Sequence, residues 1–124
     1  MDGGPAVTLE VTSEPRHARV ARTALGACAA LEGFSVEAMD DVRLVIDEIF
    51  NSFVAAGATR ITFAVRFAHR TVDVAARCRG GCDDTPEHFA ILRVLADVIA
   101  PGWSLRAADG GLVVDATFHE RPRF

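Results

Sequence analysis

The sequence contains no lysine, and all 13 of its basic residues are arginine. Chemistry that needs a lysine amine, such as a Schiff base or a lysine that holds a phosphate, is therefore excluded. No run approaches the roughly 18 consecutive apolar residues of a membrane-spanning helix, and the N-terminus lacks the charged segment and apolar stretch of an export signal. We expect a soluble, cytoplasmic protein without a membrane partner.

Acidic residues outnumber basic ones by 17 to 13, which gives a formal net charge of -4. A chain with this balance has no cationic field to attract a phosphate backbone, so direct nucleic-acid binding is disfavoured. The partner is expected to be a protein or a small molecule.

Cysteine is scarce, with Cys28, Cys78 and Cys82 as its three occurrences. An odd number in a chain without an export signal disfavours a disulfide framework. Cys78 and Cys82 could form a metal site with His88, but such a site lacks a fourth ligand. Reduced, partly buried thiols are therefore favoured over a zinc site.

Hydrophobic periodicity predicts five strands and three helices in one domain that spans residues 1–124. Alternation predicts strands over residues 7–11, 61–67 and 72–78, and a final hairpin over residues 101–118 that turns at 109–111. Spacings of three and four predict helices over residues 14–31, 36–57 and 85–100. Ser35 is expected to cap the second helix, and Thr85 with Pro86 to start the third.

This order of elements predicts an α+β fold, a two-layer sandwich in which three helices cover one face of a mixed sheet. The core is expected within residues 7–118, and the ends, residues 1–5 and 119–124, are expected to be loose. The helical residues expected in the core are Met39, Val42, Ile46, Ile49, Phe50, Phe53, Phe89, Leu92, Leu95 and Ile99. The other face of the sheet would stay wetter or meet a partner.

The second helix carries polar residues within an apolar sequence, VRLVIDEIFNSFVAAG (residues 42–57). At about 100° per residue, Glu48 and Ser52 lie one turn apart and roughly opposite the core stripe centred on Phe53. Leu44 shares that side, so it is not uniformly charged. Spacing alone favours solvated acids on an outer face, where such residues usually lie.

The segment ARTALGACAALEGFSVEAMDDVRLVIDEIFNS (residues 21–52) resembles the N-terminal half of the anti-sigma factor serine kinases, the RsbW-like branch of the GHKL (histidine-kinase-like) ATPases. The matching pieces are Arg22, the turn of Gly33 and Phe34, and the helix VRLVIDEIFNS. The order of elements also agrees with that family's small ATPase domain, and the resemblance covers residues 7–118. It implies a Bergerat-type ATPase fold with ATP and magnesium as cofactors.

By this resemblance, Glu48 falls on the glutamate that acts as general base toward a serine hydroxyl of an antagonist protein. Ser52 falls where the family has the asparagine that holds the magnesium ion. Asn51 lies one residue earlier, a rotation of about 100° on a helix, so it cannot simply substitute. The resemblance thus implies Glu48 as the catalytic residue, Ser52 as the metal ligand, and Asn51 and Ser52 beside the nucleotide.

The loop that holds adenine in the family has the pattern DxGxG, and the matching residues here are CRGGC (residues 78–82). Cys78 replaces the aspartate that accepts the adenine amino group, Gly80 keeps one glycine, and Cys82 replaces the other. A thiol is a weak hydrogen-bond acceptor and cannot reproduce a carboxylate. The alternative interpretation is that CRGG forms only a tight turn between a strand and a helix.

The second glycine loop of the family, which wraps the phosphates, aligns with PEHF, from Pro86 to Phe89. Pro86 has no backbone N–H, and Glu87 brings negative charge toward the phosphates. The lid between the two loops is only DDT, residues 83–85. Each lost charge-assisted hydrogen bond costs about 1.5–3 kcal/mol, so several losses would weaken a micromolar affinity to millimolar. We therefore expect a degenerate nucleotide pocket.

Arg16, Arg19 and Arg22 lie together on the early part of the first helix, where a solvated basic face is the commoner outcome. In the family, the arginine matched by Arg22 contacts the sigma factor and the antagonist, and a guanidinium suits bidentate capture of acidic side chains. The resemblance implies an anti-sigma factor that sequesters a sigma factor and is released by partner switching with an anti-sigma factor antagonist.

Three functions stay open from the sequence. The first is an anti-sigma factor that is also a serine/threonine kinase, with Glu48 as its base. The second is a non-catalytic interaction module of the same fold, and the third is a metal sensor built on Cys78, Cys82 and His88. A homodimer is common among relatives of this kind and would cover an exposed sheet edge.

Overall fold

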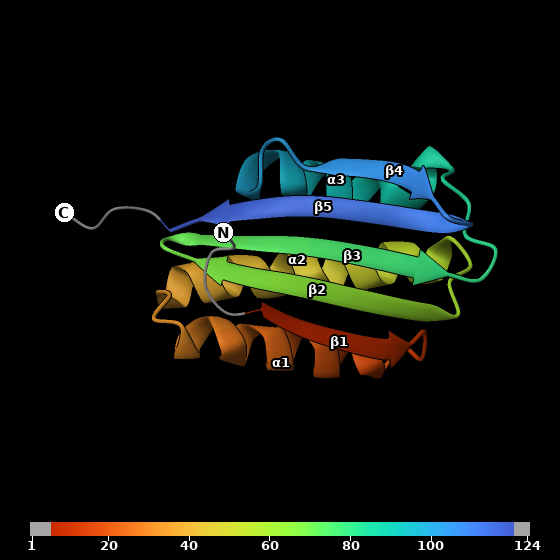
Figure 1. Ribbon diagram of the computed structural model, residues 1–124. Coiled ribbons are helices and arrows are strands. Elements are labelled where there is room, and N and C mark those ends of the chain that lie inside the picture. Colours follow the sequence, from red (N-terminus) through yellow and green to blue (C-terminus); the bar gives the residue numbers. More distant parts are fainter. Residues whose placement is uncertain (1–5, 121–124) are drawn as a thin grey trace.

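The computed structural model describes residues 6–120, which form one sheet and one layer of helices (Figure 1). The strands are β1 (Ala6–Thr12), β2 (Arg60–Ala68), β3 (Thr71–Arg79), β4 (Ser104–Ala108) and β5 (Gly111–His119). The helices are α1 (His17–Leu31), α2 (Val36–Ala55) and α3 (Ala90–Ile99), and a 3-10 turn, η1 (Pro86–Phe89), precedes α3. No helix among the described residues is long and apolar enough to span a membrane.

The five strands form one sheet in the order β1-β2-β3-β5-β4, and every neighbouring pair is antiparallel. The predicted two-layer α+β fold is confirmed, but the prediction of a mixed sheet was wrong. The crossover from β3 through α3 returns to β4 in the same direction as β3, and β5 then fills the position between them. Hydrophobic alternation carries no information about this insertion, because it is the same in parallel and antiparallel strands.

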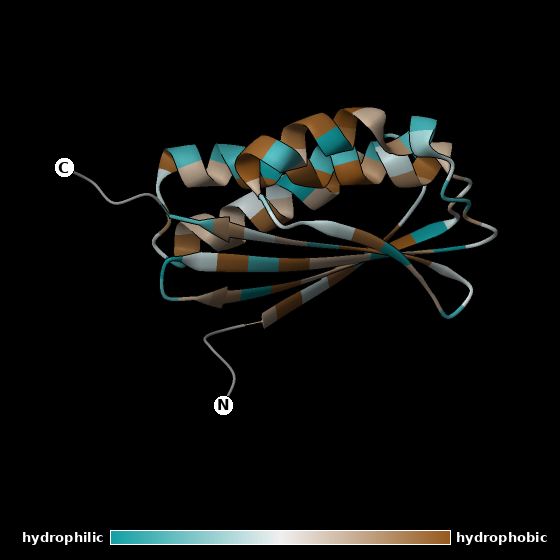
Figure 2. Cartoon of the chain, turned by 90° about the horizontal axis from the view of Figure 1, so that it is seen from above, coloured by the Kyte–Doolittle hydropathy of each residue, from teal (hydrophilic) through white to brown (hydrophobic). Residues whose placement is uncertain are grey.

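All three helices cover the same face of the sheet (Figure 2), and α2 packs against both α1 and α3. The core lies between the layers. One row of paired residues crosses all five strands and faces the helices: Leu9, Phe63, Ala76, Val114 and Leu105. The apolar positions of each strand therefore fall on the buried face, as the alternation predicts.

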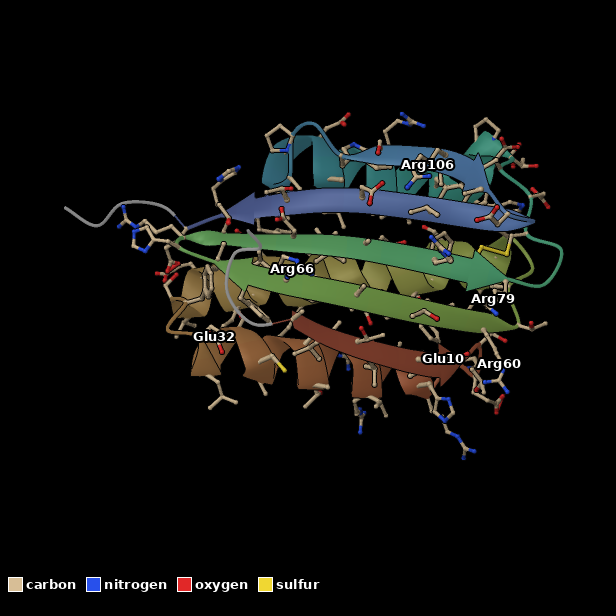
Figure 3. All side chains as sticks on the ribbon, viewed as in Figure 1. Glu10, Glu32, Arg60, Arg66, Arg79 and Arg106 are labelled. Carbon is tan, nitrogen blue, oxygen red and sulfur yellow. A yellow bond between two sulfur atoms is a disulfide. The ribbon has the colours of Figure 1, made fainter. Side chains whose placement is uncertain are left out.

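The open face of the sheet is polar around a small hollow. Figure 3 shows Arg66 and Arg106 on this face. Asp115 pairs with Arg106 at 3.3 Å, and Thr117 donates a 2.7 Å hydrogen bond to Asp73. A hollow of about 450 Å³ is floored by small residues such as Ala64 and Ala75. The prediction that this face stays wetter agrees with these cross-strand polar pairs.

The start of α2 is capped from two sides. The Ser35 hydroxyl accepts a 3.1 Å hydrogen bond from the Ala38 amide, as predicted for an N-cap. The Glu120 carboxylate in turn accepts hydrogen bonds of 2.7 Å from the Ser35 amide and 3.0 Å from its hydroxyl. The prediction of a loose end was thus wrong for His119, which belongs to β5, and for Glu120, while residues 1–5 and 121–124 lie outside the described residues.

The other two helices start later than predicted. Residues 14–16 form a turn, so α1 begins at His17. Thr85 makes no side-chain cap, and η1 separates it from α3. On α3, Leu92 is fully buried as predicted, whereas Leu95 is only partly buried because the helix lies at the edge of the layer.

Candidate functional site

Glu48 and Ser52 do not share the outer face of α2 as predicted. Ser52 is only 2% exposed, and its hydroxyl has no hydrogen-bond partner among the described residues. Glu48 is half-buried and Asn51 is exposed. The prediction was wrong because α2 is buried over a wide part of its circumference. Ser52 lies about 100° from Phe53 around the helix axis, and this side of α2 is still covered because η1 packs against the helix.

The electrostatics of Glu48 reflect its partly buried position. Burial raises the pKa of the Glu48 carboxyl above its ordinary value, and the neighbouring negative charge of Asp47 raises it further. A side-chain hydrogen bond with Asn51 opposes both effects. Glu48 therefore keeps a proton more readily than a solvated glutamate does, and its partner on the helix is Asn51 and not Ser52.

The second acid, Asp47, is committed to the neighbouring helix. Its carboxylate lies 2.8 Å from the Arg22 guanidinium on α1, and both side chains are about one third exposed. Arg43 packs its stem against Gly26, where α1 and α2 come close. The acid pair is thus divided, since Asp47 joins α2 to α1 while Glu48 lies on the flank toward α3.

The turn after β3 is closed by a disulfide between Cys78 and Cys82, which Figure 3 shows at the end of the strand. The prediction of reduced thiols was wrong for this pair, and Cys28 is the free cysteine. The odd count could not reveal that two cysteines four residues apart would meet across a tight turn. A disulfide leaves no thiolates for zinc, and no described group of three His, Cys, Asp or Glu side chains could hold a metal ion.

Gly80 is required by packing in this turn. Its φ is +95°, and a Cβ at this position would run into the side chain of Thr59. The same segment is held by a 2.8 Å hydrogen bond from the Thr59 amide to the Arg79 carbonyl and a 3.0 Å bond from the Asp83 amide to the Ala56 carbonyl. The interpretation of CRGG as a tight turn therefore accounts for this glycine without a nucleotide.

Phe89 fills the space beneath the turn. Its side chain is fully buried and meets the buried ring of Phe53 edge-on, with centroids 6.1 Å apart and an interplanar angle of 78°. This contact joins η1 to the C-terminal half of α2. An aromatic ring therefore fills the position at which the resemblance implied a second glycine loop.

The short connection of residues 83–85, which the resemblance implied to be a lid, is held by contacts of the Asp83 side chain. The Asp83 carboxylate accepts a 3.0 Å hydrogen bond from the Thr85 amide and lies 3.2 Å from His88 Nε2. Hydrogen bonding from Thr85 lowers the pKa of Asp83, and the nearby His88 adds to this effect. His88 is thereby engaged with Asp83, away from the role of metal ligand beside Cys78 and Cys82.

The residues present do not fit ATP and magnesium. Ser52 offers one buried hydroxyl in place of an amide oxygen, and Asn51 is on the exposed side of α2. Cys78 is fully buried and its sulfur is bonded to Cys82, so it cannot accept the adenine amino group. Phe89 takes up interior volume, and Pro86 lacks the N–H that a phosphate needs.

The three arginines at the start of α1 do come together. Arg16, Arg19 and Arg22 line a hollow of about 330 Å³ with Pro15 and Ala18. Arg16 precedes the first residue of α1, and Arg16 and Arg19 are exposed. No carboxylate lies within α1 itself. The ion pair with Asp47 holds Arg22 in place while Arg16 and Arg19 face outward.

One surface was missed from the sequence. Ile91, Val94 and Val98 on α3 are strongly exposed, although the sequence suggested only the inward row of that helix. The signal was present, because AILRVLADVI (residues 90–99) is apolar on more than one face. Glu120 was missed as well, and no local pattern marks a residue that caps a helix 85 positions away.

The sequence matches no protein-family model, and no curated protein is significantly similar to it. Among solved structures, the chain is similar to the crystal structure of the RsbU and RsbW domains of Rv1364c from Mycobacterium tuberculosis, with a TM-score of 0.73 at 18% sequence identity. The match covers 94% of this chain and 32% of that chain, so this chain spans about a third of the other's length. This likeness shows the fold alone, a two-layer α+β sandwich.

Proposed function

We propose that the chain is an anti-sigma regulatory protein that binds and sequesters a sigma factor by direct contact. An antagonist protein would release the sigma factor by partner switching, through competition for the same surface. The fold supports this proposal, since the similar Mycobacterium tuberculosis structure contains an RsbW domain. The binding role does not depend on nucleotide chemistry.

The observation that carries the proposal is the hollow lined by Arg16, Arg19 and Arg22. The exposed guanidinium groups of Arg16 and Arg19 suit acidic side chains of a partner, because each can form a bidentate pair with a carboxylate. Arg22 is the anchor of the group, since its 2.8 Å contact with Asp47 fixes its orientation. The partner would contact Arg16 and Arg19 first and Arg22 at the base of the hollow.

Of the two activities that the sequence suggested, serine kinase activity is less favoured than sigma-factor binding. The raised pKa of Glu48 would suit a general base, but the disulfide, Phe89 and Pro86 leave no competent nucleotide site around it. We therefore propose a binding module with a vestigial pocket, in which release depends on competition and not on phosphorylation of the antagonist.

The binding test uses sigma factors encoded in the same genome as this chain. Each is mixed with the purified protein, and binding is followed by titration calorimetry and by inhibition of transcription. We expect one of them to bind, and Arg19→Glu to weaken that binding at least about tenfold because it reverses a charge in the hollow. Arg106→Glu, on the open face of the sheet, is the matched control and should bind as the unchanged chain does.

Two results would contradict the proposal: no sigma factor binds at micromolar concentration, or Arg19→Glu and Arg106→Glu behave alike. A separate titration with ATP and magnesium tests the kinase alternative. We expect no saturation up to millimolar nucleotide. Saturation at micromolar nucleotide, with transfer of phosphate to an antagonist serine that is lost in Glu48→Gln, would restore the enzyme hypothesis.

A further inference from the structure

Helix α3 carries apolar side chains on two faces. Its inner face is buried through Leu92 and Ala96. Its outer face exposes Ile91, Val94 and Val98, which are 62%, 68% and 74% exposed. The brown colouring along α3 in Figure 2 reflects this apolar character. Scattered apolar residues on a surface need no explanation, but a continuous row of them marks an interaction surface.

The exposed row has the spacing of a helix-packing seam. Ile91, Val94 and Val98 follow i, i+3 and i+7, and the partly buried Leu95 adds i+4. Such a seam is the way in which one amphipathic helix lies along another. The flank opposite to Leu95 is used differently, since Arg93 lies over the Trp103 ring at 5.3 Å from its centroid. The seam therefore faces the side of α2.

The outer face of α2 continues the same surface. The two helices lie side by side and run in opposite directions (Figure 1), and the contact between Phe53 and Phe89 joins the end of α2 to the start of η1. Leu44, on the outer side of α2, is 46% exposed. We call the surface formed by Leu44, Ile91, Val94, Leu95 and Val98 the α2–α3 surface.

The elements that carry the α2–α3 surface are acidic. Together, α2, η1 and α3 carry seven carboxylates and two arginines, whereas α1 carries two arginines and no carboxylate. The seven are Glu37, Asp40, Asp41, Asp47, Glu48, Glu87 and Asp97. Three of these carboxylates are engaged: Asp40 pairs with Arg43 at 3.4 Å, Asp47 pairs with Arg22 of α1 at 2.8 Å, and Asp97 accepts a 2.7 Å hydrogen bond from Trp103 Nε1. Arg93 covers the Trp103 ring. Seven carboxylates against two arginines give these elements a negative net charge, which favours a basic partner.

The negative charge of α2, η1 and α3 determines which kind of partner can bind the α2–α3 surface. A second copy of the chain would bring one acidic surface against another, which is unfavourable. A basic helix would place its apolar stripe on the seam and its arginines or lysines toward carboxylates such as Glu48 and Glu87. We propose that the α2–α3 surface is a docking site for a basic amphipathic helix of a partner protein. This surface is separate from the arginine hollow on α1, so the two sites can be tested independently.

The test uses a fluorescein-labelled synthetic peptide of about 18 residues, long enough to form a helix, with leucine at seam positions and lysine elsewhere. Fluorescence anisotropy measures its binding to the full chain. We expect the double variant Val94→Ser, Val98→Ser to bind it about tenfold more weakly or worse. Leu31→Ser on α1, which changes an 84% exposed leucine, is the matched control and should bind normally. Circular dichroism confirms that both variants are folded.

Two further peptides separate docking from simple charge attraction. A scrambled peptide with the same lysines but no apolar stripe should bind much more weakly, and a peptide with glutamate in place of lysine should not bind. Equal binding of the scrambled peptide, or equal effects of the α3 and Leu31 variants, would overturn the proposal. A dimer of the unchanged chain that dissociates in the double variant would overturn it as well, because the occupant would then be a second copy. Arg19→Glu should leave peptide binding unchanged, whatever it does to the sigma factor.

Discussion

Truncation of Phe89 to alanine is expected to destabilise the domain strongly. The ring is fully buried and packs edge-on against Phe53 at a centroid distance of 6.1 Å. Replacing a buried phenylalanine by alanine costs about 3–5 kcal/mol, because transfer energy is lost and a cavity stays behind. That is a large share of the roughly 5–15 kcal/mol by which a domain is stable.

Urea unfolding followed by circular dichroism measures this loss, and thermal unfolding should show a fall in Tm of roughly 10–20 °C. Ile91→Ala is the matched control, because Ile91 lies two residues further on and is 62% exposed. Its free energy of unfolding should change by no more than about 0.5 kcal/mol. A loss below about 1 kcal/mol for Phe89→Ala would refute the reasoning. The segment would then be loose enough to move aside for a ligand, and the pocket would not be filled.

Three other predictions concern the same region. Thiol titration of the unfolded chain without reductant should detect one reactive cysteine, Cys28, and three after reduction; three before reduction would contradict the disulfide between Cys78 and Cys82. The pKa of Glu48 is raised in the folded state above its ordinary value of 4.5. At pH values just above 4.5 the folded chain therefore binds more protons than the unfolded chain. The contribution of Glu48 to the free energy of unfolding consequently falls as the pH rises through this range. Glu48→Gln should therefore be more stable than the unchanged chain at pH 7 and lose that advantage in acid, as urea titrations at a series of pH values would show; the opposite trend would mean that the carboxylate is stabilised. Gly80→Ala should lower the free energy of unfolding by about 1–3 kcal/mol, because an alanine is strained at φ +95° and its Cβ would run into the Thr59 side chain. An unchanged Tm in thermal unfolding would argue against the tight turn.

The elements of this fold follow from local patterns. Alternation located the strands to within two residues at most ends, and the Ser35 cap located the start of α2, because these signals depend on neighbours in the chain. The start of α3 was misplaced, since a threonine before a proline also begins a 3-10 turn.

The candidate site was harder to predict, because its geometry depends on distant contacts. The α1 cluster of Arg16, Arg19 and Arg22 was predicted from helical spacing, and the structure places it around one hollow. Ser52 was assigned to the wrong face, since a helical wheel gives an angle but not the width of the buried arc. That width was set by η1 and Phe89, which pack against α2 from nearly 40 residues further along the chain.

The sequence by itself determined the fold class and the number and order of the helices and strands, because hydrophobic periodicity is a local property. Its composition alone excluded chemistry that needs a lysine. Tertiary structure decided the antiparallel order of the strands, the disulfide after β3, the pairing of Arg22 with Asp47, and the exposure of one apolar face of α3. The physical reason is the same in each case: which groups lose their water depends on what packs beside them, and that partner lies far away in the chain.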